Sequence, residues 1–120
     1  MKFDKDDAFC EVYGFTLNNL VWGYLLENYN SNLAIGDMAK ELDISRPKAY
    51  QIIDEFTKNG YVIKDRVIGR TQLYALNKDN AVVKIFRRNF KECLQIVIDK
   101  YSKKKNNSSN VNVMASTKVF

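Results

Sequence analysis

The sequence predicts a mainly α-helical domain that carries one small β-hairpin, an α+β fold. Two observations predict this fold class. Apolar residues recur at helical spacing in four segments, and between the third and fourth segments the period changes to that of β-strands. The chain has 120 residues, which is enough for one compact domain and not for two.

Two helices are predicted in the N-terminal half, after an extension (residues 1–15) whose packing the sequence does not define. The first helix runs from Thr16, a favoured N-cap residue, to about Asn28. It is apolar over much of its circumference, so we expect it to be buried. The polar run 28–32 predicts a loop. A second, shorter helix then has apolar residues at i, i+3, i+4 and i+7, namely Ile35, Met38, Ala39 and Leu42.

The third helix, residues 45–59, has both of its ends marked in the sequence. Ser45 is a favoured N-cap residue. Pro47 falls in the first turn, where backbone N–H groups have no acceptor within the helix, so the N–H that proline lacks is not needed there. Gly60 supplies a left-handed stop. Only two residues separate this helix from the preceding one, and the first of them, Asp43, tolerates a left-handed conformation. The two helices are therefore predicted to form a helix-turn-helix unit. The stripe that the third helix buries is Ala49, Ile52, Ile53 and Phe56.

The first turns of this third helix carry long polar side chains on the side away from the buried stripe. Arg46, Lys48 and Gln51 can all donate hydrogen bonds. An exposed helix start of this kind can enter the major groove of DNA and contact base edges and phosphates. The alternative is an ordinary amphipathic helix with a charged, solvated face, and this segment alone does not decide between the two.

After Gly60 the alternating pattern predicts a β-hairpin over residues 61–76, with Gly69 in the turn. Few apolar residues lie near its tip, so we expect a flexible basic finger and not a core element. The polar residues at this tip are Arg66, Arg70, Thr71 and Gln72.

A long fourth helix is predicted from Ala81 to about Tyr101, and it is apolar over a wide arc. A terminal helix in a small domain needs such an arc when it meets a second surface. We expect that surface to be a second copy of the chain, because most soluble oligomers are symmetric dimers. The alternative is that the helix packs on the first helix. The residues expected at the dimer interface are Phe86, Phe90, Cys93, Val97 and Tyr101. The polar, lysine-rich tail, residues 102–120, is expected to be disordered.

Charge is distributed unevenly along the chain. Residues 1–44 hold 3 basic and 8 acidic side chains, residues 45–72 hold 6 and 3, and residues 84–105 hold 8 and 2. The basic side of the molecule therefore includes the capped helix and the hairpin, which predicts a polyanionic partner. Charge alone does not distinguish DNA from RNA or from an acidic protein.

Several other classes of protein are disfavoured by the sequence. It contains no histidine, and its cysteines, Cys10 and Cys93, lie 83 positions apart, so we expect no metal site and no cofactor. No phosphate-binding glycine loop or nucleophile motif is present, so we do not expect an enzyme. No run is long and apolar enough to span a membrane, and the N-terminus lacks the apolar core of a signal peptide. We therefore expect a cytoplasmic, nucleoid-associated protein with reduced cysteines.

The predicted order of helix, helix, tight turn, capped helix, basic hairpin and long helix resembles a winged helix-turn-helix transcriptional regulator of the prokaryotic MarR/ArsR-like superfamily. The resemblance covers residues 12–101. It rests first on residues 38–62, MAKELDISRPKAYQIIDEFTKNGYV, which are similar to the helix-turn-helix with its recognition helix. It rests also on residues 68–84, IGRTQLYALNKDNAVVK, which resemble the wing and the start of the dimerisation helix.

The resemblance implies a winged helix-turn-helix DNA-binding domain over residues 16–80 and a dimerisation helix over 81–101. It implies a recognition helix (45–59) in the major groove and a wing (61–76) on the DNA backbone or in the minor groove. The residues implied to contact DNA are Ser45, Arg46, Lys48, Tyr50 and Gln51 in the helix, and Arg66, Arg70, Thr71 and Gln72 in the wing. Tyr50 adjoins the buried stripe, so a partly buried position is the alternative for this residue.

The sequence thus predicts a sequence-specific transcriptional regulator that binds double-stranded DNA as a homodimer, with no effector implied. One alternative is a plasmid or viral protein that segregates or shapes DNA. Another is a winged helix that binds only protein, against which the basic wing and the polar start of the recognition helix argue. For Arg70 the alternative is a hairpin-tip charge that binds nothing.

Overall fold

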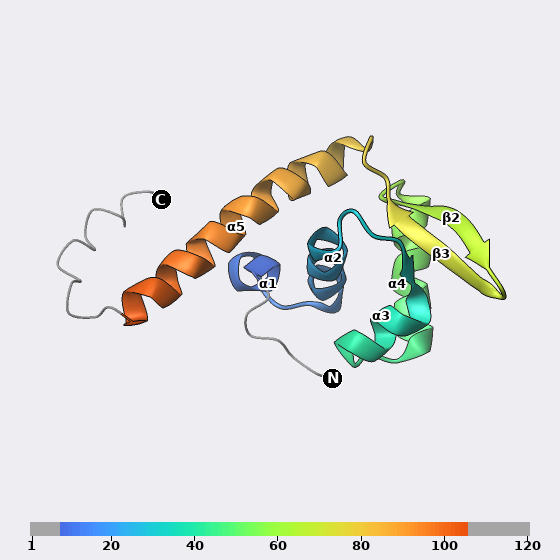
Figure 1. Cartoon of the computed structure of the whole chain (residues 1–120), viewed down its shortest axis with the longest axis horizontal. Helices are drawn as coiled ribbons and strands as arrows, with labels where there is room; N and C mark the ends of the chain where they lie inside the picture. The colour runs from blue at the N-terminus through green and yellow to red at the C-terminus, as the bar shows by residue number, and fades with distance from the viewer. Residues whose placement is uncertain (1–7, 106–120) are drawn as a thin grey trace.

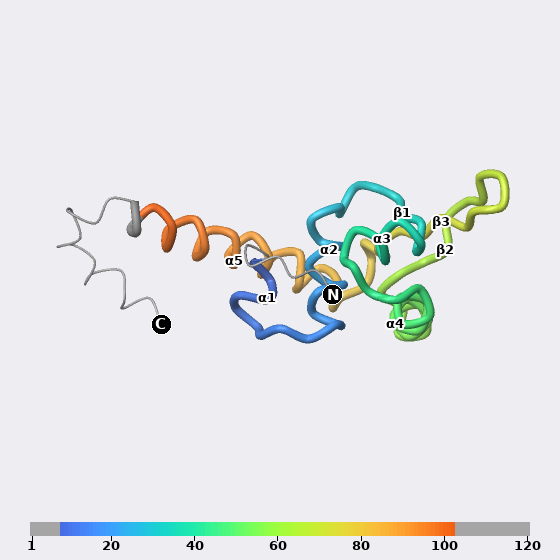
Figure 2. Tube along the Cα trace, turned by 90° about the horizontal axis from the view of Figure 1, so that it is seen from below, coloured from blue at the N-terminus to red at the C-terminus, as the bar shows by residue number. Residues whose placement is uncertain are grey.

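The computed structural model describes residues 8–105, with the side chains of residues 8–102. Helices α2, α3 and α4 form a compact body, from which the β2–β3 hairpin projects at one end and the C-terminal half of α5 at the other (Figures 1 and 2). The elements in chain order are α1 (Ala8–Tyr13), α2 (Leu17–Glu27), β1 (Leu33–Ala34), α3 (Ile35–Leu42), α4 (Arg46–Lys58), β2 (Val62–Ile68), β3 (Thr71–Leu76) and α5 (Ala81–Lys105).

Helix α2 is the central element of the core, as its apolar circumference predicts. Thr16 caps it, and the Thr16 hydroxyl accepts a hydrogen bond from the backbone N–H of Asn19 at 3.0 Å. Trp22 joins α2 to the other elements, because its ring packs on three aromatic rings from different parts of the chain. Its ring centroid lies 5.0 Å from that of Phe56 in α4, 5.1 Å from that of Tyr61 and 4.6 Å from that of Phe86 in α5.

Helices α3 and α4 form the predicted helix-turn-helix. The turn depends on Asp43, which adopts the left-handed conformation with φ of 58°. The following N–H, of Ile44, then donates to the Ala39 carbonyl at 3.0 Å, which closes the end of α3. The small side chain of Ala39 is buried between the helices.

Both ends of α4 are built as the sequence predicts. At its start the Ser45 hydroxyl accepts from the backbone N–H of Lys48 at 3.2 Å, and Pro47 lies in the first turn. At its end Gly60 has φ of 83°, and the N–H of Tyr61 donates to the Phe56 carbonyl at 2.9 Å. The Tyr61 and Phe56 rings also pack together, with centroids 5.7 Å apart. These bonds and this contact are those of a glycine-terminated helix end.

The sheet has three antiparallel strands in the order β1–β3–β2, one more than the hairpin that the sequence predicts. Strand β1 has only two residues, too few to show an alternating pattern, and it pairs through Leu33 with Tyr74. The β2–β3 pairing is interrupted between Lys64 and Val67, where two residues of β2 lie opposite the single residue Leu73. This irregularity is a β-bulge.

Helix α1 lies within the N-terminal extension, whose packing the sequence leaves undefined, and it packs along α5. Phe9 of α1 is buried, and its ring meets that of Phe86 at a centroid distance of 5.6 Å. At the other end of this contact Lys100 Nζ lies 3.0 Å from Glu11 Oε1. The extension therefore contributes to the core, although residues 1–7 of it lie outside the described part of the chain.

This packing changes the place of most residues expected at the dimer interface. The side chains of Phe90, Cys93 and Val97 are buried within their own chain, and Phe86 is half-buried against Phe9 and Trp22. Of the five, Tyr101 alone is exposed, by 37%. The sequence pattern predicts a partner subunit for this stripe because it does not indicate helix α1, which packs along α5 within the same chain.

Helix α5 also runs further than predicted, to Lys105 instead of about Tyr101. Residues 102–105 are therefore helical and not part of a disordered tail, in keeping with the high helix propensity of lysine. The rest of the predicted tail, residues 106–120, lies outside the described residues. Over residues 8–105 none of the helices is long and apolar enough to cross a membrane.

Candidate nucleic-acid interface

The start of α4 presents a polar surface over a buried stripe. Ala49, Ile52, Ile53 and Phe56 are buried in the core, whereas Ser45, Arg46, Lys48, Tyr50 and Gln51 are all exposed. Tyr50 is 50% exposed, so the alternative of a half-core position does not hold for it. The side chains predicted to contact DNA from the helix are thus free to meet a ligand along one face.

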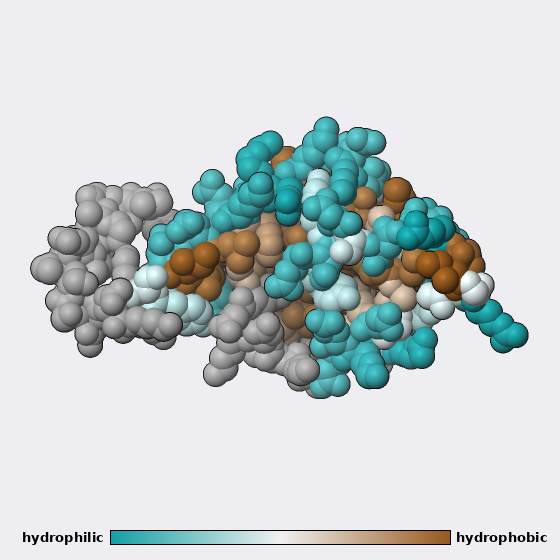
Figure 3. Space-filling model, viewed as in Figure 1, coloured by the Kyte–Doolittle hydropathy of each residue, from teal (hydrophilic) through white to brown (hydrophobic). Residues whose placement is uncertain are grey.

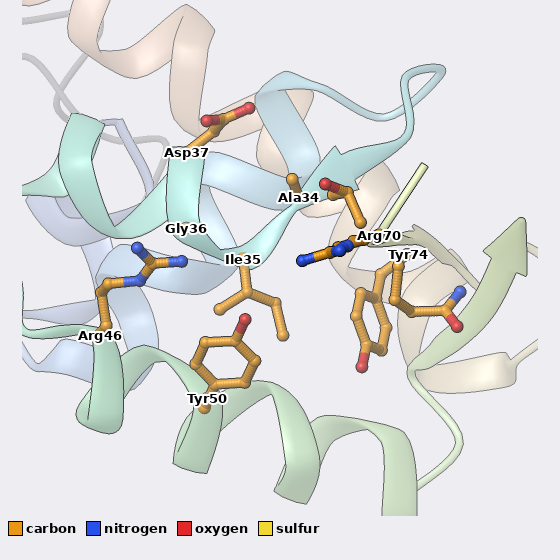
Figure 4. A pocket seen from close by; sticks show the side chains of 10 residues that line it. Ala34, Ile35, Gly36, Asp37, Arg46, Tyr50, Arg70 and Tyr74 are labelled. Carbon is orange, nitrogen blue, oxygen red and sulfur yellow. The ribbon is translucent and has the colours of Figure 1, made fainter. Parts of the chain in front are cut away.

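A hollow of about 320 Å³ lies between the starts of α3 and α4 and the wing. Figure 4 shows the guanidinium groups of Arg46 and Arg70 approaching it from opposite sides, with Ile35 and Tyr50 between them. The structure therefore brings together side chains from two segments that are separate in the sequence. The residues that line the hollow are Ala34, Ile35, Gly36, Asp37, Arg46, Tyr50, Arg70, Thr71, Gln72 and Tyr74.

Gly36 is a residue of this hollow that the sequence analysis did not single out. A Cβ atom at Gly36 would lie 2.8 Å from Nη2 of Arg46, so the guanidinium rests where a side chain of α3 would otherwise stand. The sequence does carry a signal for this contact. A glycine stands in the first turn of a helix, where the backbone geometry does not need one. Asp37, the next residue, also lines the hollow, and in Figure 4 its carboxylate points away from both arginines.

The wing ends in a tight turn at Gly69 and Arg70. Ile68 pairs with Thr71, so Gly69 is the first central residue of a two-residue hairpin turn. This position often needs a positive φ, and Gly69 has φ of 63°. Arg66, Arg70 and Thr71 are exposed.

Gln72 behaves differently from the other predicted wing residues, because its amide nitrogen bonds within the chain. Nε2 of Gln72 donates to the Leu73 carbonyl at 2.9 Å and to the Arg66 carbonyl at 3.3 Å. The side chain is half-buried. Sequence reasoning could not foresee this role, because the bulge that exposes the Arg66 carbonyl has no clear signature in the sequence.

Carboxylates gather on the flank formed by α2 and α3. Burial raises the pKa of the Tyr24 phenol above its usual value, and the nearby charges of Glu41, Asp37 and Glu27 raise it further. The phenol is therefore neutral near pH 7. This flank is acidic, while the start of α4 and the wing are basic, which locates the charge asymmetry predicted from the sequence.

Within residues 8–105, no group of three or more histidine, cysteine, aspartate or glutamate side chains is arranged to hold a metal ion. Cys10 and Cys93 are both buried, and no disulfide joins them.

No model of a protein family matches the sequence, and no curated protein is significantly similar to it. Solved structures do match the fold. MepR, a transcription regulator of the multidrug efflux pump MepA of Staphylococcus aureus, has 20% identity and a TM-score of 0.56, over 96% of this chain and 87% of MepR. The adhesin competence repressor AdcR of Streptococcus pyogenes has 19% identity and a TM-score of 0.60, over 92% of this chain and 80% of AdcR.

A mutant of S. aureus MepR bound to an oligodeoxyribonucleotide is also similar, with 20% identity and a TM-score of 0.54 over 96% of this chain and 86% of that one. Each of these similarities covers more than nine-tenths of this chain. The chain therefore shares the fold of these solved structures, a winged helix-turn-helix with a long C-terminal helix.

Proposed function

We propose that this protein is a sequence-specific transcriptional regulator that binds double-stranded DNA as a homodimer. Helix α4 enters the major groove, and the wing contacts the DNA backbone or the minor groove. The observation that carries the proposal is the convergence of Arg46, from the recognition helix, and Arg70, from the wing, on one hollow. The similar MepR mutant that was solved with an oligodeoxyribonucleotide supports DNA as the ligand of this fold.

The two arginines have different parts in this proposal. Arg46 lies in the first turn of α4, the part of a recognition helix that reaches base edges, and its planar guanidinium can bind O6 and N7 of guanine together. Arg70 lies at the wing turn, where a contact to phosphate gives affinity without reading sequence. Lys48 and Gln51 extend the polar face of α4, and Gln51 can bind adenine through two hydrogen bonds.

The homodimer is proposed to form through the apolar side chains that α5 leaves exposed beyond α1. Leu94, Ile98 and Tyr101 recur at i, i+4 and i+7, and Ile98 is 54% exposed. Figure 3 shows hydrophobic atoms at the surface along this half of α5. Two-fold pairing through this stripe would cover it, and it would present two recognition helices to two half-sites.

Selection of bound duplexes from a random pool tests the proposal. We expect a motif with two-fold symmetry whose half-sites are about one helical turn, or a multiple of it, apart. Binding without any motif would replace the regulator with a DNA-segregating or architectural protein. No binding to duplex DNA at low salt would leave a winged helix that recognises protein.

A further inference from the structure

The β-bulge of the wing is held by hydrogen bonds from side chains on both faces of the sheet. Asp65 and Arg66 of β2 lie together opposite Leu73, between the pairs Lys64–Tyr74 and Val67–Gln72. A bulge bends its strand and increases the local twist, so it sets the direction of everything beyond it. Beyond this bulge lies the wing turn with Arg70, and within it lies Arg66.

On the face of the sheet that faces the core, the bulge is tied by Gln72. Gln72 shares this face with Tyr74 and Leu76, because side chains alternate along a strand. Its Nε2 donates to the Arg66 carbonyl at 3.3 Å and to the Leu73 carbonyl at 2.9 Å. The bulged carbonyl of β2, which the regular ladder would otherwise satisfy, is thereby given a partner.

On the opposite face the bulge is tied by Asp65. Asn32 directly precedes β1, and its Nδ2 donates to Oδ2 of Asp65 at 2.5 Å. Because β3 lies between β1 and β2 in the sheet, this bond spans the whole sheet. It fixes the bulge to the body of the domain and not only to the neighbouring strand.

Asp65 is the acidic side chain in an otherwise basic wing, between Lys64 and Arg66. A carboxylate beside a surface that meets phosphates repels them and weakens binding. A structural role is therefore needed to explain an aspartate at this position. Its hydrogen bond to Asn32 supplies that role.

We propose that Asn32, Asp65 and Gln72 form a bulge lock, which fixes the backbone of Arg66 so that its guanidinium is positioned for a DNA phosphate. Gln72 is then a positioning residue and not a DNA contact. This inference rests on the proposed function, to which it adds the residues that orient the wing. A wing that is fixed before binding loses less conformational entropy when it meets DNA.

The first test uses charge-matched variants at Asp65, with binding to a selected duplex as the readout. Asp65→Asn keeps an oxygen that can accept from Asn32, whereas Asp65→Ala does not, and both remove the negative charge. The lock predicts that Asp65→Ala binds about two- to tenfold more weakly than Asp65→Asn, the range expected for one hydrogen bond. Asn32→Ala, which changes no charge, should weaken binding by a similar factor, and combining it with Asp65→Ala should add nothing to the effect of Asp65→Ala. Equal affinities for the two Asp65 variants would overturn this half of the lock.

The second test asks what Gln72 does. Gln72→Met preserves size and removes both hydrogen bonds without changing any charge. If Gln72 positions Arg66, this neutral substitution should flatten the dependence of log affinity on log salt by up to about 0.9, the share of one phosphate contact. It should have little effect in an Arg66→Ala background. A direct contact from Gln72 to DNA would instead weaken binding by the same factor in both backgrounds and leave the slope unchanged, which would overturn the proposal.

Amide hydrogen exchange of the free protein separates this inference from the proposed function, because it needs no DNA. The lock predicts faster exchange over residues 66–73 in Gln72→Met and Asn32→Ala, with the α2 amides unaffected. If the wild type binds no duplex, the proposed function fails, whatever the exchange shows. If the wild type binds DNA but neither variant changes exchange or salt slope, the lock fails and the proposed function stands.

Discussion

Nδ2 of Asn80 donates to the Gly60 carbonyl at 3.1 Å, which joins the start of α5 to the end of α4. The side-chain oxygen of the same residue, Oδ1, caps α5. It accepts from the backbone N–H groups of Val82 at 2.8 Å and Val83 at 3.1 Å. Asn77 donates to the Gly60 carbonyl as well, at 3.0 Å. A single carbonyl therefore fixes the recognition helix relative to the helix proposed to form the dimer.

Two substitutions of Asn80 should distinguish the stability that comes from the α5 cap from the stability that comes from the hydrogen bond to Gly60. Asn80→Ala removes both, and we expect it to lower the free energy of unfolding by about 1–2 kcal/mol. Asn80→Ser keeps a capping hydroxyl but is too short to reach Gly60, so about half of the loss should be recovered. Urea unfolding followed by the fluorescence of Trp22, the single tryptophan of the sequence, measures both. Equal stabilities of Asn80→Ala and the wild type would contradict the role of this residue.

Alanine substitution should lower the stability of the fold at Gly60 but not at Gly36. Gly60 has φ of 83°, which an alanine adopts only at a strain of about 1–2 kcal/mol, so Gly60→Ala should destabilise the fold. Gly36 lies in the first turn of α3 with ordinary helical geometry, so Gly36→Ala should cause no loss of stability.

In Gly36→Ala the new Cβ must displace the Arg46 guanidinium, which lies 2.8 Å from its position. We therefore expect weaker DNA binding at unchanged stability, and no further weakening in an Arg46→Ala background. Urea unfolding and DNA titration of the same samples check this pair. A Gly36→Ala protein with wild-type DNA binding would show that the position of Arg46 in the free protein is not the one used.

Neighbouring residues of α5 provide a matched test of the dimer. Ile98 is 54% exposed and Val97 is 7% exposed, so only Ile98 faces outward. Ile98→Asp should give folded monomers, because it places a charge on the proposed interface. Val97→Asp should unfold the chain, because it buries a charge that has no partner. Sedimentation and Trp22 fluorescence distinguish these outcomes, and a wild type that is monomeric at micromolar concentration would contradict the homodimer.

Arg70 should act mainly through phosphate. Arg70→Ala should weaken binding to all sequences by a similar factor and flatten the salt dependence of log affinity by about 0.9. Lys91→Ala is the control, because it removes the same charge from an exposed position on α5, away from the wing. An identical effect of the two substitutions would mean that the wing attracts DNA only through the total charge of the protein.

Local signals explain why much of this fold could be predicted from the sequence. Ser45, Pro47 and Gly60 define the ends of α4 through bonds within a few residues, and the structure confirms them. The left-handed turn at Asp43 and the hairpin turn at Gly69 are equally local.

The features that the sequence did not predict depend on contacts between distant segments. Strand β1 exists only because Leu33 and Ala34 pair with β3, some 40 residues away. The sequence predicts a partner for the apolar stripe of α5 because residues 8–13, although largely apolar, show no pattern that indicates where they pack. The bonds of Gln72 depend on a bulge in the opposite strand, and the position of Arg46 depends on Gly36 in another helix.

Substitution of Arg46 tests whether the start of α4 reads base sequence. The measurement is the base preference selected from random duplexes by the wild type, by Arg46→Ala and by Arg46→Lys, which keeps the charge but loses the planar fork. We expect both variants to lose preference at one symmetric pair of base positions, by about 1–3 kcal/mol, while the rest of the motif persists. If Arg46→Lys selects the wild-type motif, or if Arg46→Ala lowers affinity for all sequences equally, the recognition helix does not read DNA through this residue.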